Sequence, residues 1–349
     1  MRRFDYGFLK CQLTGDMVGL AEIVADLRAR EEFRKLQYPE AFEALRVEAV
    51  IASVKGSNAI EGIVTSDSRI RDLVAGAAPL GHDEQEISGY KDALNQIHSH
   101  YATMDVDEET ILGLHRMVEE QSAPQEAGHY KSRNNFIMEY GPDGSRRVRF
   151  KPVPAGDTGK AMQQLLLAYY EARQDSGISP LLLIPCFVLD FLCIHPFMDG
   201  NGRISRLLTV LLLYISGYDI VRYISYEEQV NKYKAGYYDS LKRASLGWDE
   251  NRNDYVPVIV YFLQILYRSY KDLDGAFAGT SLKKAKKSER VELLLLESPV
   301  PVSKAEILHR LPDVSAKTVE AVLSRLLKDG RLVKIGSYRD ARYMKNHRQ

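Results

Sequence analysis

Two strongly apolar segments, residues 181–194 and 207–215, flank a polar stretch of only twelve residues and constrain the fold more than any other feature. Each apolar segment suits a buried helix. The stretch between them, residues 195–206, reads HPFMDGNGRISR and must therefore form a tight loop that begins the second helix. One turn between two buried helices thus combines a titratable base, a carboxylate, two glycines, an amide and two arginines.

The glycines and the helix start in this loop predict an anion site. Gly200 and Gly202 allow positive φ, so that backbone N–H groups can turn toward one point. A helix start adds free N–H groups and the positive end of the helix dipole. Arg203 and Arg206 lie three residues apart and can lean over the same phosphate. Asp199 fits beside phosphates only if a cation such as Mg²⁺ lies between them.

His195 is the only strong general base in the loop. Its ordinary pKa near 6.5 leaves the ring mostly neutral at cytosolic pH, and a positioned base contributes about 10²–10⁴-fold in rate. A P-loop is excluded because no G-x-x-x-x-G-K-[ST] run occurs, and a zinc site because no His or Cys stands at ligand spacing from His195. A helix-capping loop with a buried His is the alternative, but it does not explain why so many specified residue types coincide. We therefore predict a polyphosphate site beside a base that deprotonates a hydroxyl.

The loop resembles the signature of the Fic family, H-P-F-x-[DE]-G-N-G-R-x-x-R, at every specified position, and the likeness extends from about residue 49 to residue 247. The resemblance implies a mainly α fold, with an all-helical core and a β-hairpin flap. It also implies an enzyme that transfers AMP from ATP, with Mg²⁺, to a Ser, Thr or Tyr hydroxyl of a target protein or of itself. The related Doc-like branch carries Lys at the position of Gly202 and transfers phosphate, so glycine favours AMP transfer.

The same resemblance implies the role of each loop residue. His195 would be the catalytic base that deprotonates the acceptor hydroxyl, and Asp199 would hold Mg²⁺ against the phosphates. The implied ATP-binding residues are Gly200, Asn201, Gly202, Arg203 and Arg206, with Tyr237 and Tyr238 as candidates near the adenine. Helical tyrosines more often belong to a core than to a ligand site, which is the alternative for the last two.

A second motif lies far upstream at residues 57–62, SNAIEG, and resembles the inhibitory element of the family, [ST]-x-x-x-E-[GN]. Its specified positions are Ser57, Glu61 and Gly62. A helix that carries Glu61 could place the carboxylate on Arg206, where a γ-phosphate would bind. An ordinary helix end capped by Gly62 is the alternative. We expect an enzyme restrained by its own Glu61, and the reverse reaction, removal of AMP, stays open because some relatives use this glutamate for it.

A hairpin is predicted between these motifs. Residues 134–140 and 148–153 are extended in character and are joined through Gly-Pro-Asp-Gly at 141–144, a strong turn signal. The preceding Gly-His-Tyr-Lys at 128–131 resembles the lead-in of the family, where Arg is commoner than Lys. A strand edge near the catalytic base could align a target by strand addition. A plain surface hairpin is an equally good interpretation.

Charge changes sign along the chain although the formal net charge is zero. Residues 283–349 carry 16 Lys and Arg against 8 Asp and Glu, a net +8, so residues 1–282 carry −8. Small residues and a lysine cluster interrupt the helical pattern just before this basic segment. We predict four parts: an N-terminal helical region with the inhibitory motif at 1–105, the Fic catalytic domain at 106–274, a linker at 275–287 and a winged helix-turn-helix at 288–349.

The last part shows three helical segments and a two-stranded wing, at residues 288–297, 303–311, 315–330, 331–335 and 341–344. One interpretation is DNA binding through Lys317 and Arg325 on the third helix and Arg339 and Arg342 on the wing. A protein-binding or dimerisation module is equally consistent, and a homodimer is one option because relatives often dimerise. The rival function for the whole chain is therefore a DNA-binding regulator whose Fic domain senses nucleotide.

The remaining composition excludes other classes. Three cysteines, Cys11, Cys186 and Cys193, do not suggest a disulfide framework. We find no signal peptide, and Asp190 interrupts the longest apolar run before it reaches the length of a membrane span. We expect a soluble, cytoplasmic protein without a membrane partner.

Overall fold

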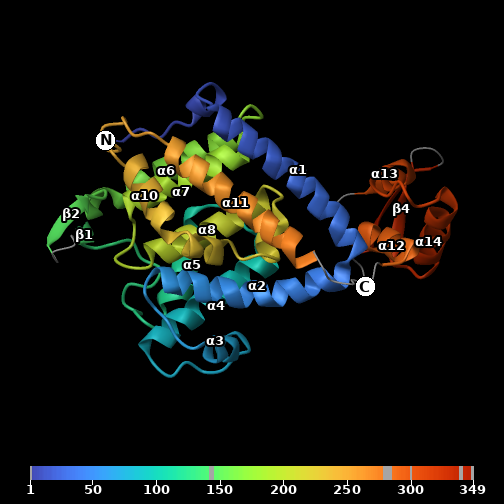
Figure 1. Cartoon of the computed structure of the whole chain (residues 1–349), viewed down its shortest axis with the longest axis horizontal. Coiled ribbons are helices and arrows are strands. Elements are labelled where there is room, and N and C mark those ends of the chain that lie inside the picture. The colour runs from blue at the N-terminus through green and yellow to red at the C-terminus, as the bar shows by residue number, and fades with distance from the viewer. Residues whose placement is uncertain (1, 141–144, 278–284, 299–300, 338–340, 347–349) are drawn as a thin grey trace. The chain divides into compact units, whose positions relative to one another are not determined.

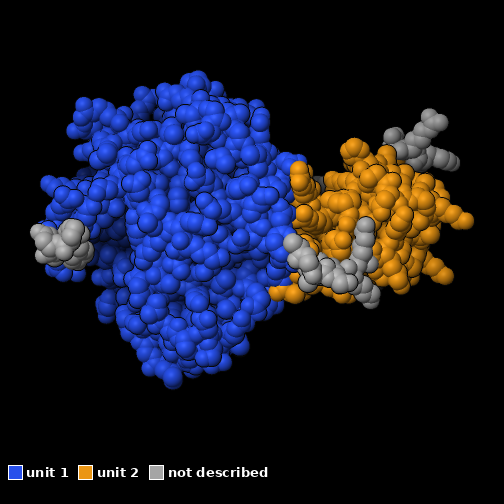
Figure 2. All heavy atoms as spheres, viewed as in Figure 1, with its two compact units in different colours: residues 1–27, 45–276 blue, residues 28–44, 277–349 orange. Residues whose placement is uncertain are grey.

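The structure is a computed structural model, and it describes residues 2–140, 145–277, 285–298, 301–337 and 341–346. The fold is mainly α-helical with a few short strands (Figure 1). Two compact units divide the chain (Figure 2): unit 1 contains residues 1–27 and 45–276, and unit 2 contains residues 28–44 and 277–349. Each unit is described by itself below.

Unit 1 is built almost entirely from helices, as the sequence predicted. The α-helices of the chain up to the end of this unit are α1 (Gly15–Gln37), α2 (Pro39–Ile60), α3 (Asp67–Val74), α4 (His82–His100), α5 (Glu108–Glu119), α6 (Thr158–Gln174), α7 (Pro180–Ile194), α8 (Asn201–Ile215), α9 (Tyr226–Lys232), α10 (Lys234–Ala244) and α11 (Val256–Phe277). Short 3₁₀ helices lie at Gly7–Lys10, Tyr101–Thr103, Ala155–Asp157 and Asp219–Arg222. None of the helices in the described part of the chain is long and apolar enough to cross a membrane.

Helices α7 and α8 form the centre of unit 1. Helix α7 starts with Pro180 in its first turn, where a backbone N–H would have no partner within the helix. In α8 every residue from 203 to 214 is buried. Helix α8 packs against α4, α5 and α7, and α7 also packs against α6. The two apolar segments are therefore buried helices, as predicted, and the loop between them is held on a rigid base.

The boundary expected between residues 1–105 and 106–274 does not separate two compact units, because α4 and α5 lie on either side of it and pack together within unit 1. A Cβ atom at Gly89 of α4 would lie only 2.4 Å from the backbone oxygen of Val118 in α5. Only glycine permits so close an approach of two helices. Residues 45–105 therefore belong to the same core as the segment that follows them.

A hairpin of β1 (Ile137–Tyr140) and β2 (Arg146–Phe150) projects from unit 1 (Figure 1). The strands are antiparallel and pair Met138 with Val148 and Ile137 with Phe150, so that one residue of β2 bulges out. The predicted second strand, 148–153, is shifted: β2 starts earlier and ends at Phe150, because prolines follow at 152 and 154 and cannot donate to a strand pair. The predicted turn at 141–144 lies outside the described residues.

The C-terminal part of unit 2 consists of α12 (Lys287–Glu297), α13 (Lys304–Arg310), α14 (Ala316–Lys328) and a three-stranded antiparallel sheet. The sheet order is β3 (Val302–Ser303), β5 (Arg342–Lys345), β4 (Leu332–Ile335). Ser315 accepts a hydrogen bond from Thr318 N and so caps α14, as predicted. Buried apolar residues from all three helices and from β3 and β4 form one core, including Val291, Leu295, Val302, Ile307, Val319, Leu326 and Leu332.

The segment between the helices on either side of the predicted linker, 275–287, is shorter than predicted. Helix α11 continues to Phe277, and α12 already begins at Lys287. Between them, Ala285 donates a backbone hydrogen bond to Gln37 O at 2.8 Å. Residues 278–284 and Arg339 of the predicted wing lie outside the described residues.

Candidate active site

The loop between α7 and α8 has left-handed backbone at both ends. His195 caps the C-terminus of α7 with φ 52° and ψ 62°, and Gly200 caps the N-terminus of α8 with φ 77°. In the described part of the chain, His195 and Asn251 are the non-glycine residues with positive φ. A residue with a bulky side chain adopts this conformation only when its surroundings hold it there, and such residues cluster at functional sites.

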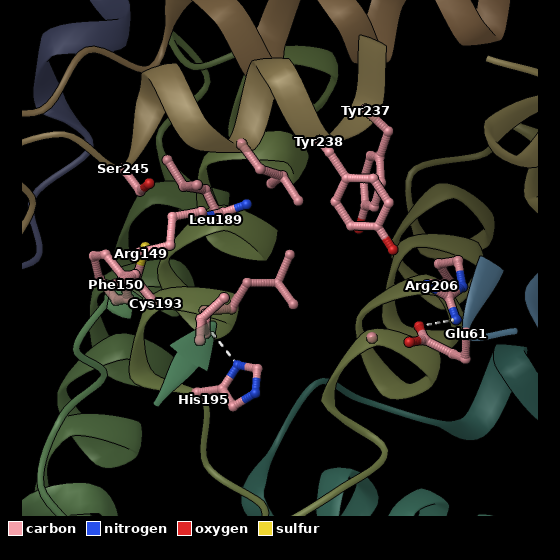
Figure 3. Close-up of a pocket in the computed structure, with 14 residues that line it drawn as sticks. Glu61, Arg149, Phe150, Leu189, Cys193, His195, Arg206, Tyr237, Tyr238 and Ser245 are labelled. Atoms are coloured by element: carbon pink, nitrogen blue, oxygen red, sulfur yellow. Dashed lines mark hydrogen bonds and ion pairs between the residues drawn. The ribbon is translucent and has the colours of Figure 1, made fainter. Parts of the chain in front are cut away.

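The imidazole of His195 is held in the form that a base requires. Its Nδ1 lies 3.2 Å from the backbone oxygen of Leu192, which can only accept, so Nδ1 carries the proton and Nε2 keeps its lone pair. Burial lowers the pKa of His195 to about 4, so the ring is neutral near pH 7. Figure 3 shows the ring at the edge of a cavity, as expected for a general base.

Two side chains close the loop from within. Asn201 Oδ1 accepts from Phe197 N at 3.0 Å, and Asn201 Nδ2 donates to Phe197 O at 2.9 Å. The phenyl ring of Phe197 is buried and stacks on the imidazole of His115, with ring centroids 3.7 Å apart. Asn201 was expected to bind phosphate oxygens, but the structure uses both ends of its amide to fix the loop.

Two residues that the sequence analysis did not assign hold the loop from outside. Lys131 Nζ donates to Ile194 O at 3.0 Å, and Lys131 N donates to Pro196 O at 2.9 Å. His115 Nδ1 accepts from Gly128 N, so its Nε2 carries the proton and faces Asp199 O at 3.3 Å. Burial lowers the pKa of Lys131 to about 8 and that of His115 to about 4.

Arg206 is buried and makes three hydrogen bonds to the segment 57–61. Its Nε donates to Ser57 Oγ at 2.9 Å, and its Nη2 donates to Ser57 O at 3.0 Å and to Glu61 Oε1 at 2.8 Å. Glu61 is the first residue after α2, and Gly62 has φ 88° and turns the chain away. Lys234 Nζ donates to Ile60 O at 2.6 Å and so holds the end of α2. The structure thus contains the predicted contact between Glu61 and Arg206.

Two glycines of the loop leave room for acidic side chains that lie against them. A Cβ atom at Gly202 would lie 2.2 Å from Glu61 Oε1 and 3.2 Å from Arg206 Nη1. A Cβ atom at Gly200 would lie 2.7 Å from Glu119 Oε1, in addition to the positive φ at that position. The Glu61 carboxylate therefore covers the first turn of α8 at Gly202, where the helix N–H groups were expected to bind phosphate.

The structure separates the two arginines that the sequence analysis placed on one phosphate. The guanidinium of Arg203 is 2% exposed and forms ion pairs with Glu86 of α4 and, at 2.8 Å, with Glu119 of α5. Arg203 is absent from the residues that line the cavity next to His195. It therefore anchors α8 to α4 and α5. The sequence contains only a weak indication of a buried ion pair at these two acids, because each is a charged residue on the apolar face of a helix.

Replacing Arg203 with methionine is expected to lower the free energy of unfolding by about 3–5 kcal/mol, because two buried carboxylates would lose their cation. Urea unfolding at neutral pH measures this change. Arg243→Met is the matched control, since Arg243 and Asp239 form an exposed ion pair whose loss should cost less than about 1 kcal/mol. Equal effects of the two substitutions would contradict the anchoring role of Arg203.

The carboxylate of Asp199 extends into solvent and is 79% exposed. Its Oδ1 accepts from Gly200 N at 2.6 Å. In the part of the chain that the structure describes, no group of three or more His, Cys, Asp or Glu side chains could hold a metal ion. A magnesium ion at Asp199 would therefore take most of its ligands from phosphate and water, which is the usual arrangement for Mg²⁺.

The cavity beside the loop brings the base, the inhibitory motif and the two tyrosines together (Figure 3). Tyr237 is 8% exposed and Tyr238 is 39% exposed, and both line the cavity opposite His195. Fourteen residues line it: Glu61, Ile137, Arg149, Phe150, Leu189, Leu192, Cys193, His195, Gly202, Arg206, Tyr237, Tyr238, Leu241 and Ser245. Half of the site residues expected from the sequence thus line this cavity, whereas Asn201 and Arg203 support the loop from behind.

Part of the chain is similar in sequence to known Fic proteins. Residues 105–213 match the model of the Fic/DOC family. Protein adenylyltransferase fic-1 of Caenorhabditis elegans is 26% identical over 261 residues, which cover 72% of this chain and 46% of that protein. Protein adenylyltransferase Fic of Nematostella vectensis is 26% identical over 243 residues, which cover 67% of this chain and 50% of that protein. The chain spans about half the length of the curated relatives it matches.

Solved structures show the same fold. A Fic family protein from Desulfovibrio desulfuricans G20 aligns with a TM-score of 0.62 and 19% identity, over 97% of this chain and 98% of that one. Fic-1 from Caenorhabditis elegans aligns with a TM-score of 0.57 and 25% identity, over 74% of this chain and 72% of that one. The helical fold of this chain therefore has counterparts in Fic structures.

Proposed function

We propose that this chain, which contains a Fic domain over residues 105–213, is a protein adenylyltransferase that moves AMP from ATP to a hydroxyl of a protein. The observation that supports it best is the cavity that an unprotonated His195 Nε2 and the guanidinium of Arg206 both line. A base and a phosphate-binding cation at one site suit attack of a hydroxyl on a nucleotide. The names of the curated relatives point the same way.

The reaction follows from these groups. His195 Nε2 accepts the proton of a Ser, Thr or Tyr hydroxyl, and the oxygen attacks the α-phosphorus of ATP. The bond from the α-phosphorus to the bridging oxygen breaks, and pyrophosphate leaves. Arg206, once it is free of Glu61, binds the outer phosphates, while the backbone N–H of Gly202 faces the phosphate chain. Most of the rate enhancement then comes from positioning and charge neutralisation.

Asp199 is the residue that would hold Mg²⁺ beside the phosphates. Its carboxylate is exposed next to the start of α8, and the single hydrogen bond from Gly200 engages one of its two oxygens. This donor set fits an ion that takes one protein carboxylate together with phosphate and water oxygens. When bound, Mg²⁺ would neutralise the charge that develops on the leaving pyrophosphate.

Glu61 restrains this activity in our proposal. Its carboxylate accepts a hydrogen bond from the guanidinium of Arg206 and fills the space in front of Gly202. The outer phosphates of ATP need both the guanidinium and that space. Ser57 and Lys234 hold the end of α2 in place, so that Glu61 is presented to Arg206 by fixed backbone. Removal of AMP is a second candidate function, because Glu61 and His195 line the same cavity and could activate water together.

For the C-terminal part of unit 2 we propose a binding role, with DNA or protein as the partner. Two of the arginines expected to contact DNA have acids of their own unit as partners: Arg325 pairs with Glu292, and Arg342 lies 3.4 Å from Glu306. Acids that pair with these arginines compete with DNA phosphates for them. The basic charge of this segment is therefore a weaker argument for DNA than the sequence alone suggested.

Transfer of label from ATP tests the proposed activity. With Mg²⁺ and a cell extract as the source of targets, label at the α-phosphate should become attached to protein and label at the γ-phosphate should not. Label from the γ-phosphate alone would show phosphate transfer instead. No protein label from either position, with the Glu61→Gly variant present, would contradict the enzyme and favour a nucleotide-sensing domain.

A further inference from the structure

The cavity contains a second arginine that the proposed reaction does not use. Arg149 of β2 lines the cavity together with His195 and Arg206. Its Nε is buried without a hydrogen-bond partner in the described part of the chain. Glu61 is the only acid among the lining residues, and it is paired with Arg206. A buried donor without an acceptor is costly, so the arrangement points to a ligand that supplies one.

A local irregularity of the hairpin turns this side chain inward. Ile137 pairs with Phe150 and Met138 pairs with Val148, so Arg149 is the extra residue of a β-bulge. A bulge redirects side chains relative to a regular strand, in which neighbours point to opposite faces. Arg149 and the adjacent Phe150 consequently both line the cavity.

The position of Arg149 matches the base of the nucleotide, an argument that rests on the proposed function. With the α-phosphorus at His195 and the outer phosphates at Arg206, the ribose and base extend away from Arg206. Figure 3 shows Arg149 and Ser245 on the side of the cavity opposite Glu61 and Arg206. The same side offers apolar surfaces that suit the flat faces of a base, from Phe150, Leu189 and Cys193.

We infer that Arg149 binds the edge of the nucleotide base and allows the site to use GTP as well as ATP. A guanidinium carries donors only. Guanine presents two adjacent acceptors, O6 and N7, which arginine binds with two hydrogen bonds, whereas adenine presents N7 beside an amino donor. The transfer balances as for ATP: the hydroxyl oxygen binds the α-phosphorus of GTP, pyrophosphate leaves, and His195 takes the proton.

Equilibrium binding in a Glu61→Gly background tests the inference, because Glu61 then no longer covers Arg206. Calorimetry with Mg²⁺ gives the dissociation constants of ATP, GTP and tripolyphosphate. Arg149→Gln should shift the ratio of GTP to ATP affinity toward ATP by about 5- to 150-fold, because a glutamine amide pairs with adenine N6 and N7. Arg147→Gln is the matched control, since Arg147 lies on the same strand and is 70% exposed beside Glu139. It should leave the ratio unchanged.

The possible outcomes separate this inference from the proposed function. An unchanged ratio in Arg149→Gln, or undetectable GTP binding beside normal ATP binding, overturns the inference and leaves the proposed function standing. An equal loss for both nucleotides and for tripolyphosphate would make Arg149 a phosphate ligand, which also overturns it. If neither nucleotide binds to the Glu61→Gly background, the proposed function itself fails.

Discussion

Replacing Glu61 with glycine should raise the rate of AMP transfer by about 10- to 150-fold, which corresponds to the roughly 1.5–3 kcal/mol of a hydrogen bond between charged groups. The carboxylate accepts from Arg206 Nη2 at 2.8 Å and covers Gly202. Without it, Arg206 remains held by Ser57 through two further bonds, so the guanidinium stays in position for a phosphate. Protein-bound label from α-labelled ATP measures the rate.

Controls separate removal of the restraint from damage to the fold. Glu61 follows the last residue of α2, so glycine at this position does not interrupt the helix. The melting temperature should fall only through the loss of the ion pair with Arg206, and the helix content should stay unchanged. Glu61→Gln keeps the size of the side chain but removes its charge, and its rate should fall between those of the wild type and Glu61→Gly. If all three proteins transfer AMP equally fast at ATP concentrations below saturation, Glu61 does not restrain the enzyme.

Removing the base should have the opposite effect. His195→Ala, made in the Glu61→Gly background, is expected to lower the rate about 10²- to 10⁴-fold, the usual contribution of a positioned general base. The hydrogen bond to Leu192 O leaves Nε2 unprotonated, and burial keeps the pKa near 4. The rate of the parent should therefore not fall through protonation of His195 between about pH 6 and pH 8, and the imidazole should lose activity only as the pH approaches 4.

A second variant separates chemistry from backbone strain at this position. His195 has φ 52°, a conformation that asparagine tolerates better than alanine. His195→Asn keeps a polar side chain there but cannot take up the proton, so it should be as inactive as His195→Ala. His100→Ala, a change at an exposed histidine near the end of α4, should leave the rate unchanged. Persistent label transfer by both His195 variants would exclude His195 as the base.

The sequence predicted the loop, its two buried helices and the contact between Glu61 and Arg206, because each follows from local pattern or from motifs. Apolar runs indicate buried helices. The motifs at residues 57–62 and 195–206 contain Glu61 and Arg206, the two residues in contact. The sequence did not predict that Arg203 would form buried ion pairs instead of binding phosphate. The partners of Arg203 are Glu86 and Glu119, which lie 117 and 84 positions away in the chain. Helical spacing indicates which residues share one face of a helix, but it does not reveal which distant acid packs against that face.

The amino-acid sequence by itself determined the helical class, the loop at residues 195–206 and the expected contact of Glu61 with Arg206, since short-range periodicity, residue type and motifs carry that information. Only the tertiary structure decided that Asn201 closes the loop, that Arg203 is an anchor and that Arg149 enters the cavity. These outcomes depend on the packing of α4, α5 and α8 and on one bulge in a hairpin. The packing of elements that are distant in the sequence sets the direction of these side chains, and a local sequence pattern does not contain that information.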